Sequence, residues 1–147
     1  MRQAFVVLSA LFFAIPSFSQ VRKIPAAVTD AFANQYPDAS NVKYEDYIIT
    51  VHVHFNTDTG KMTAKYNSDG NWKETERGWV YDSLSADVKD GFKKSKYAVD
   101  WQVKETAIIY APGNETRYRI KVEKSDLQKK YLFFDTKGRL VREALTI

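Results

Sequence analysis

The sequence contains 147 residues, of which 44% are hydrophobic and 27% are charged, and its formal net charge is +4 at neutral pH. This length and composition suit one ordinary domain, or two very small ones that share a core, and they exclude a disordered or collagen-like chain. The sequence has no cysteine, which excludes disulfide bonds, thiolate catalysis, cysteine-ligated zinc and lipidation of an N-terminal cysteine. The mild, mixed charge gives no indication of nucleic-acid binding.

An export signal is predicted at residues 1–19. Arg2 precedes an apolar run over residues 4–15, and the small residues Ser17 and Ser19 follow that run. This order of a positive charge, an apolar stretch and small residues is typical of a secretory signal, and the run is shorter than the ~20 residues that a spanning helix needs. We expect cleavage after about Ser19 and a mature, membrane-free protein in a bacterial periplasm or outside the cell, which also suits a cysteine-free chain.

Two parts of the mature chain resemble each other in the same order. The segment 24–32 aligns with 84–92 at an offset of 60 residues, and the segment 66–72 aligns with 134–140 at an offset of 68. The growing offset predicts extra residues in a hairpin loop of the second copy. We interpret the pattern as a tandem repeat. The predicted units are residues 20–79 and residues 80–147.

Each repeat is predicted to begin with a short amphipathic helix. Apolar residues recur at helical spacing over 24–32 and again over 84–92. The residue before a proline is disfavoured in helical conformation, so the first helix should end before Pro37. Ser83 or Ser85 is expected to cap the second helix.

After each helix, apolar and polar residues alternate, which predicts half-buried strands joined by tight turns. In the first repeat the inward set is Ile49, Val51, Val53 and Phe55. Four strands joined in sequence order form an antiparallel meander. A lone unit of about sixty residues would be only marginally stable, so we expect the two sheets to join edge to edge or at least to pack together. The predicted fold is α+β, with two tandem helix-plus-four-strand repeats, an antiparallel sheet of about eight strands, both helices on one face, and the other face uncovered.

One set of residues in the first repeat has a counterpart in a known family. These residues are Pro25-Ala26-Ala27-Val28, Phe32, Tyr36-Pro37, Ala39, Val42-Lys43 and Asp69-Gly70-Asn71-Trp72. Through them the chain resembles the PepSY-like, or beta-lactamase-inhibitor-like, family of exported bacterial proteins, over residues 22–145 as two copies. The second copy departs from the pattern, because Ser85 replaces the proline and no proline follows Tyr97. The resemblance implies a sheet of about eight strands with two helices on one face, but it does not imply inhibition of a beta-lactamase, since fold does not fix function.

Catalytic and metal-binding patterns are weak. The sequence has no Gly-x-Ser-x-Gly elbow, no glycine-rich phosphate loop and no triad-like spacing, so we predict no enzyme activity and no cofactor. The two histidines, His52 and His54, lie two residues apart and therefore point to the same side of a strand. They are most simply solvent-facing strand residues, but a metal- or small-ligand-binding protein using both is the alternative function that we keep open.

The uncovered sheet face is the predicted partner-binding surface. Its predicted residues are Thr50, His52, His54, Lys65, Arg117, Arg119 and Lys121. Arginine and aromatic side chains are enriched at protein-binding hot spots. We therefore predict a non-enzymatic exported module that docks an unknown protein or peptide of the cell envelope, with neither nucleic acid nor membrane as its partner. A structural envelope protein is a third, more distant alternative.

Overall fold

The computed structural model describes residues 23–146, so the predicted export signal lies outside the described residues. The first half contains α1 (Ala26–Gln35), β1 (Ser40–Asp46), β2 (Thr50–Thr57), β3 (Gly60–Asn67) and β4 (Trp72–Trp79). The second half contains α2 (Ala86–Lys94), β5 (Gln102–Ala111), β6 (Glu115–Ser125), β7 (Gln128–Asp135) and β8 (Leu140–Leu145). Two short 3₁₀ turns, η1 (Tyr81–Ser83) and η2 (Pro112–Asn114), precede α2 and β6.

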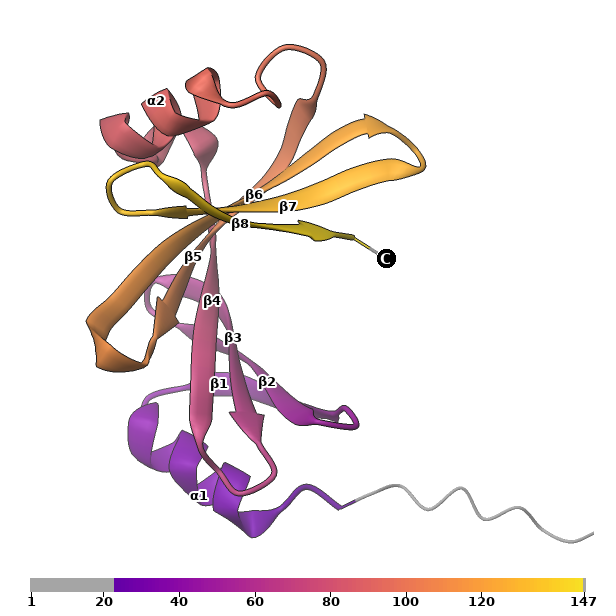
Figure 1. Cartoon of the computed structure of the whole chain (residues 1–147). Coiled ribbons are helices and arrows are strands. Elements are labelled where there is room, and N and C mark those ends of the chain that lie inside the picture. Colours follow the sequence, from indigo (N-terminus) through magenta and orange to yellow (C-terminus); the bar gives the residue numbers. More distant parts are fainter. Residues whose placement is uncertain (1–22, 147) are drawn as a thin grey trace, which may run out of the picture.

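All eight strands form one antiparallel sheet in the order β1 to β8, which confirms the predicted α+β class (Figure 1). The two halves join through β4 and β5, which pair from Thr75 opposite Tyr110 to Trp79 opposite Thr106. Figure 1 shows that the sheet twists strongly, so that the outer strands of the two halves cross at a large angle.

Both helices cover the same face of this sheet, as predicted. Side chains directly opposite each other in an antiparallel pair share a face, and this face can be followed across the sheet from Val53 through Ala64 to Thr75. It continues from Thr75 to Tyr110 on β5 and onward into β6. The core under α1 consists of Val28, Phe32, Val51, Val53, Phe55, Ala64 and Tyr66. The core under α2 consists of Leu84, Val88, Phe92, Tyr97, Ile120, Val122, Leu132 and Phe134.

The helix ends follow the local sequence signals. α1 ends at Gln35, two residues before Pro37, and the Tyr36 N–H donates to the Phe32 carbonyl. Ser85 is the N-cap of α2, where its hydroxyl accepts a hydrogen bond from the Val88 N–H at 3.4 Å. Ser83, the other predicted cap, belongs to the preceding 3₁₀ turn.

Corresponding turns follow the third strand of each half. The Asn67 side-chain oxygen accepts hydrogen bonds from the amides at positions 69 and 71, and the Asp135 carboxylate accepts from those at positions 137 and 139. Each turn contains a glycine with positive φ, Gly70 at 83° and Gly138 at 77°. The two halves therefore share both their order of elements and this turn geometry.

Two sequence expectations are corrected by the structure. The extra residues of the second half do not lengthen a hairpin loop, because β5 and β6 have 10 and 11 residues where β1 and β2 have 7 and 8. They instead extend a strand pair. Ile49, predicted to face inward, lies outside both β1 and β2 and is 78% exposed, because the chain turns between Asp46 and Thr50.

Candidate binding surface

The structure places all seven predicted surface residues on the sheet face opposite the helices, which we call the outer face. Three come from β2 (Thr50, His52 and His54), one from β3 (Lys65) and three from β6 (Arg117, Arg119 and Lys121). The residues between them on each strand point to the helices, as the alternating burial of β2 shows. The seven form two groups rather than one, because β4 and β5 lie between β3 and β6.

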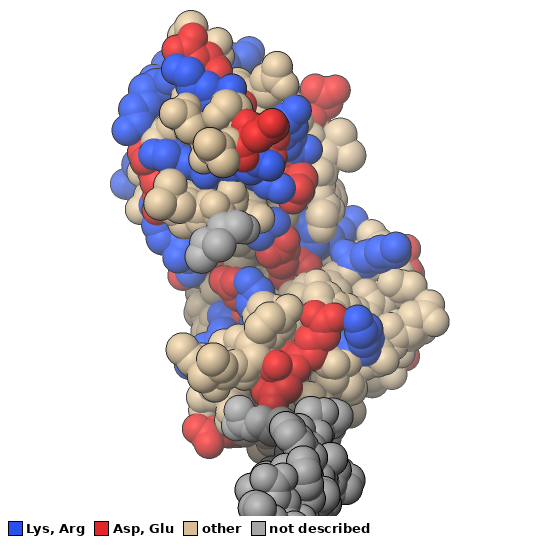
Figure 2. Space-filling model, turned by 90° about the vertical axis from the view of Figure 1, so that its right-hand side faces the viewer, with Lys and Arg blue, Asp and Glu red and all other residues tan. Residues whose placement is uncertain are grey.

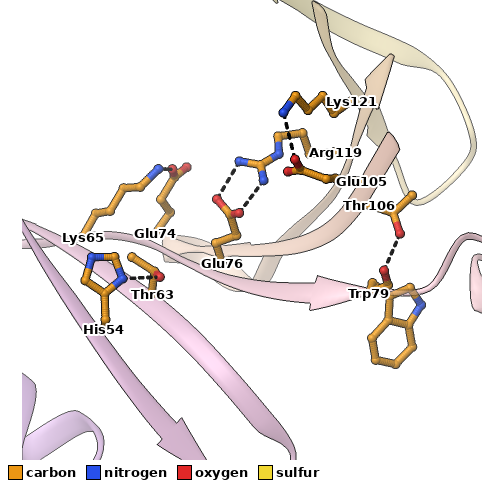
Figure 3. Close-up of polar contacts among 10 residues, drawn as sticks. All are labelled: His54, Thr63, Lys65, Glu74, Glu76, Trp79, Glu105, Thr106, Arg119 and Lys121. Carbon is orange, nitrogen blue, oxygen red and sulfur yellow. Dashed lines mark hydrogen bonds and ion pairs between the residues drawn. The ribbon is translucent and has the colours of Figure 1, made fainter. Parts of the chain in front are cut away.

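Carboxylates neutralise the cations on this face, and Arg117 has its partner, Glu115 at 2.9 Å, on its own strand. Lys65 pairs with Glu74 at 2.7 Å, and the Lys121 ammonium contacts Glu105 at 2.8 Å (Figure 3). The sequence analysis named only the cations, because the partners of Lys65 and Lys121 lie on neighbouring strands and can be identified only once the strand register is known.

The most enclosed of these pairs joins the two halves. Two guanidinium N–H groups of Arg119 donate to the two carboxylate oxygens of Glu76, at 2.7 and 2.5 Å (Figure 3). The Arg119 side chain is only 14% exposed and that of Glu76 is 21% exposed. A two-point, partly buried pair of this kind has more geometric specificity than an exposed single contact.

The outer face is open, as expected, but its own charged side chains are paired across its centre. Glu76 on β4 and Arg119 on β6 bridge across β5, where Ile109 pairs with Glu76 and is only 1% exposed. The Arg119 guanidinium also lies 4.5 Å from the centre of the Tyr131 ring. The face covers its own apolar centre with long side chains, since no helix of residues 23–146 lies over it.

His54 stands in a chain of hydrogen bonds across three strands. Its Nδ1 lies 2.9 Å from the Thr63 hydroxyl, and its Nε2 lies 3.1 Å from Glu45. Hydrogen bonds from Lys43, His54 and Tyr47 lower the pKa of Glu45 to about 2. The ionised carboxylate can only accept, so the His54 Nε2–H is the donor in this contact.

The hydrogen-bonded series of Thr63, His54 and Glu45 has the order of a hydroxyl, a base and an acid, but it lacks the donors to an oxyanion that acyl transfer also requires. Hydrolases stabilise the developing oxyanion with preorganised donors, commonly backbone N–H groups. Thr63 lies on β3, which is paired on both sides, by β2 and by β4. Its neighbouring amides are used in those ladders. We interpret this hydrogen-bonded series as a polar link that fixes β1, β2 and β3 relative to one another.

His52 is held separately from His54. Its Nε2 lies 3.2 Å from the Thr50 hydroxyl, and its ring contacts the Tyr47 ring in a tilted arrangement with centroids 4.3 Å apart. Burial, followed by the nearby charge of Lys65, lowers the pKa of His52. Among residues 23–146, no group of three or more histidine, aspartate or glutamate side chains is arranged to hold a metal ion.

One exposed feature was missed by the sequence analysis. Tyr47, Ile48 and Ile49 form the tip of the β1–β2 hairpin and are 49%, 93% and 78% exposed. Consecutive exposed apolar residues are unusual unless they serve a function. The run of three large apolar residues is the sequence signal for this tip. The alternating pattern of β2, extended by one residue, wrongly predicts that Ile49 lies in the core.

Positive charge is concentrated on the second half of the molecule. Residues 80–147 contain 14 Lys and Arg against 10 Asp and Glu, whereas residues 20–79 contain 7 against 8. Figure 2 shows Lys and Arg side chains gathered over the upper part of the molecule, where β6 to β8 lie, among fewer acidic ones. Neither helix within residues 23–146 is long and apolar enough to cross a membrane.

Solved structures with the same fold come from several Bacteroides species. A DUF2874 family protein from Bacteroides ovatus is 24% identical, with a TM-score of 0.73, over 84% of this chain and 88% of its own. A BLIP-like protein from Bacteroides fragilis is 25% identical, with a TM-score of 0.72, over 84% and 88% of the two chains. A protein from Bacteroides eggerthii, described as "putative periplasmic", is 22% identical, with a TM-score of 0.72, over 84% and 89%.

No curated protein matches the sequence. A family model described as "Putative beta-lactamase-inhibitor-like, PepSY-like" matches residues 49–142, from the start of β2 into β8. The match includes most of the second half, where the sequence departs most from the family pattern. It confirms the family that the sequence resembles, over residues 49–142 and without testing the two copies: the chain belongs to the PepSY-like, beta-lactamase-inhibitor-like family.

Proposed function

We propose that this chain is an exported, non-enzymatic binding module that docks a protein or peptide partner of the cell envelope on the outer face of its sheet. The observation that carries the proposal is the construction of that face, in which long charged side chains are held in cross-strand pairs around the partly buried pair of Glu76 and Arg119. The descriptions of two relatives, as BLIP-like and as "putative periplasmic", support a binding role and an envelope location.

Preordered side chains favour binding for a physical reason. A flexible lysine or arginine loses rotamer freedom when a partner immobilises it, which costs roughly 0.5–1.5 kcal/mol for each side chain. On the outer face much of this ordering occurs on folding, because Lys65, Arg119 and Lys121 already contact carboxylates. The face carries both signs of charge, so we expect its partner to present a matching pattern of both signs rather than a uniformly charged surface.

The metal-binding alternative has no comparable support. His52 and His54 are engaged by Thr50, Thr63 and Glu45, and the described residues offer no third ligand in position. A structural metal site ordinarily needs four protein ligands, and a catalytic one three. We therefore carry only the docking function forward.

The test is a capture experiment followed by a measured affinity. Immobilised mature chain would be exposed to periplasmic extract, the retained proteins identified by mass spectrometry, and the leading one purified and bound again by calorimetry. Arg117→Glu reverses a charge on the outer face and leaves the Glu76–Arg119 pair intact. We expect this variant to weaken the partner's binding at least tenfold.

Lys94→Glu supplies the matched control. Lys94 is paired with a nearby carboxylate, Asp90, as Arg117 is with Glu115, but it lies on α2, on the opposite side of the sheet. Its reversal should leave the affinity within about twofold. Equal affinities for Arg117→Glu and Lys94→Glu would remove the outer face as the docking surface.

A further inference from the structure

A second surface lies where the two halves of the sheet meet. A groove of about 540 Å³ is lined by Arg77, Trp79, Val80, Ser83, Lys104 and Glu105. We call it the junction groove. It borders the core under α2, against which Trp79 packs. Figure 3 shows the Trp79 indole pointing to the opposite side of β4 from Glu76, away from the outer-face pairs.

The junction groove contains two cations that lack carboxylate partners within residues 23–146. The Arg77 guanidinium lies 4.8 Å from the centre of the Trp79 ring and forms no ion pair there. The Lys104 ammonium donates to the neutral Gln102 side chain at 3.1 Å. The carboxylate in the groove, Glu105, is already paired with Lys121 at 2.8 Å. The groove is therefore locally positive although an acidic residue lines it.

An apolar strip accompanies these cations. Val80 is 64% exposed, and the Trp79 ring is fixed by a hydrogen bond from its Nε1–H to the Ser83 carbonyl at 3.2 Å. An arginine stacked on an indole keeps the N–H groups at its edge available for a carboxylate. A tryptophan with an adjacent arginine is a common composition of binding hot spots.

We propose that the junction groove binds an extended acidic segment of a protein, with carboxylates on Arg77 and Lys104 and an apolar side chain against Trp79 and Val80. Charge complementarity selects this occupant, because both uncompensated groups are cations and the groove also offers an apolar wall. The proposal is independent of docking on the outer face, since none of these four residues belongs to the set proposed for that function.

The probe is a fluorescein-labelled peptide of alternating glutamate and leucine, followed by fluorescence anisotropy with the mature chain at low salt. The counterpart with lysine in place of glutamate and a single-stranded oligonucleotide test other ligand classes. We expect the acidic peptide to bind and the lysine peptide not to bind. The double variant Arg77→Glu, Lys104→Glu should weaken the binding of the acidic peptide at least tenfold.

The matched control is Arg142→Glu with Lys137→Glu, which makes the same change in net charge. Arg142 likewise stacks on an aromatic ring, that of Phe133 at 3.9 Å, but outside the junction groove. The control variant should lose less than threefold in its affinity for the acidic peptide. If circular dichroism shows that the groove variant is unfolded, Arg77→Gln with Lys104→Gln replaces it, with a loss of at least fivefold expected.

Three results would overturn the inference. They are undetectable binding of the acidic peptide by the native chain, equal losses in the groove and control variants, and tighter binding of the lysine peptide or the oligonucleotide than of the acidic peptide. A failure here leaves the outer-face experiment unaffected, because that experiment changes Arg117 and measures a different partner.

Discussion

Gly138 shows how a single residue can fix the packing of a helix on the sheet. It lies in the turn between β7 and β8 with φ at 77°, and a Cβ added to it would collide with the Asp87 carbonyl of α2. On the helix, a Cβ at Gly91 would collide in turn with the Gly138 carbonyl. Two glycines thus allow the backbone of the turn and that of α2 to approach closely. Gly70 has the corresponding position against Ala27 of α1.

We predict that Gly138→Ala destabilises the protein far more than Gly113→Ala does. Both glycines have φ at 77°, so each substitution incurs the ~1–2 kcal/mol of the left-handed conformation. A Cβ at Gly113 meets open space, whereas at Gly138 it must displace α2, which adds roughly 1–3 kcal/mol. Urea unfolding of the two variants measures the difference, and equal free energies of unfolding would show that the close approach is not required.

At the scale of elements, Tyr97 connects the segment after α2 to the edge of the sheet. Its side chain is 2% exposed, and its hydroxyl donates to Glu143 on β8 and accepts from Lys130 on β7 at 3.2 Å. The first half has a neutral link instead, in which the Tyr66 hydroxyl donates to the side-chain oxygen of Gln35 at 2.8 Å. Each half therefore fastens its helix region to the sheet through a buried tyrosine, with different chemistry.

Tyr97→Phe should lower the free energy of unfolding by roughly 1–2 kcal/mol at pH 7, because it removes a hydrogen bond to a charged, partly exposed carboxylate. Tyr66→Phe is the matched variant and should cost about 1 kcal/mol or less, since its partner is neutral. Urea unfolding at pH 7 provides both values. A larger cost for Tyr66→Phe would contradict the assignment of the charged link.

The Tyr97 link should also depend on pH. The hydrogen bond from Tyr97 lowers the pKa of Glu143 below its ordinary 4.5. A carboxyl group with a lowered pKa in the folded protein stabilises the fold above its ordinary pKa, and this contribution is lost as the pH falls through the folded value. The difference in free energy of unfolding between the native protein and Tyr97→Phe should therefore be constant from pH 7 to about 5 and shrink below pH 4.5. A difference that grows on acidification would contradict this.

At the scale of the whole molecule, two small cores share one sheet. Each core has its own helix, and a half of about sixty residues buries so little surface that it would be only marginally stable alone. The halves are held together by the β4–β5 ladder, by the hydrogen bond from the Thr106 hydroxyl to the Trp79 carbonyl at 2.5 Å, and by the pair of Glu76 and Arg119. We therefore expect the chain to unfold as one cooperative unit.

Phe134→Ala tests this cooperativity. Phe134 is fully buried in the core under α2, and its truncation should cost about 3–5 kcal/mol. If the halves are coupled, the opening free energy measured by native-state hydrogen exchange should fall in β2 and β3 of the first half by the same amount as in β7. Faster exchange confined to the second half would show that the two cores unfold separately.

The sequence by itself determined the local elements and the fold class, because helical and alternating hydrophobic periods are set by which residues need burial. It placed the end of α1 before Pro37 and a tight turn at Gly70, since proline and glycine constrain the backbone wherever they stand. Only the tertiary structure decided which charges meet. Glu76 and Arg119 are 43 residues apart and come together solely through the register of β4, β5 and β6.

The tip of the β1–β2 hairpin and the junction groove depended on the tertiary structure for the same reason. A continuous apolar run over residues 47–49 fits a strand or a turn equally well by its pattern, and the hydrogen bond from the Tyr47 N–H to the Thr50 carbonyl decides for a turn. Arg77 and Lys104 line one groove because the β4–β5 pairing ends at Trp79 and Thr106, which leaves residues 102–105 of β5 beyond the end of β4. Periodicity specifies which side of a strand a residue occupies, but the neighbours of that residue are specified by how the strands pair.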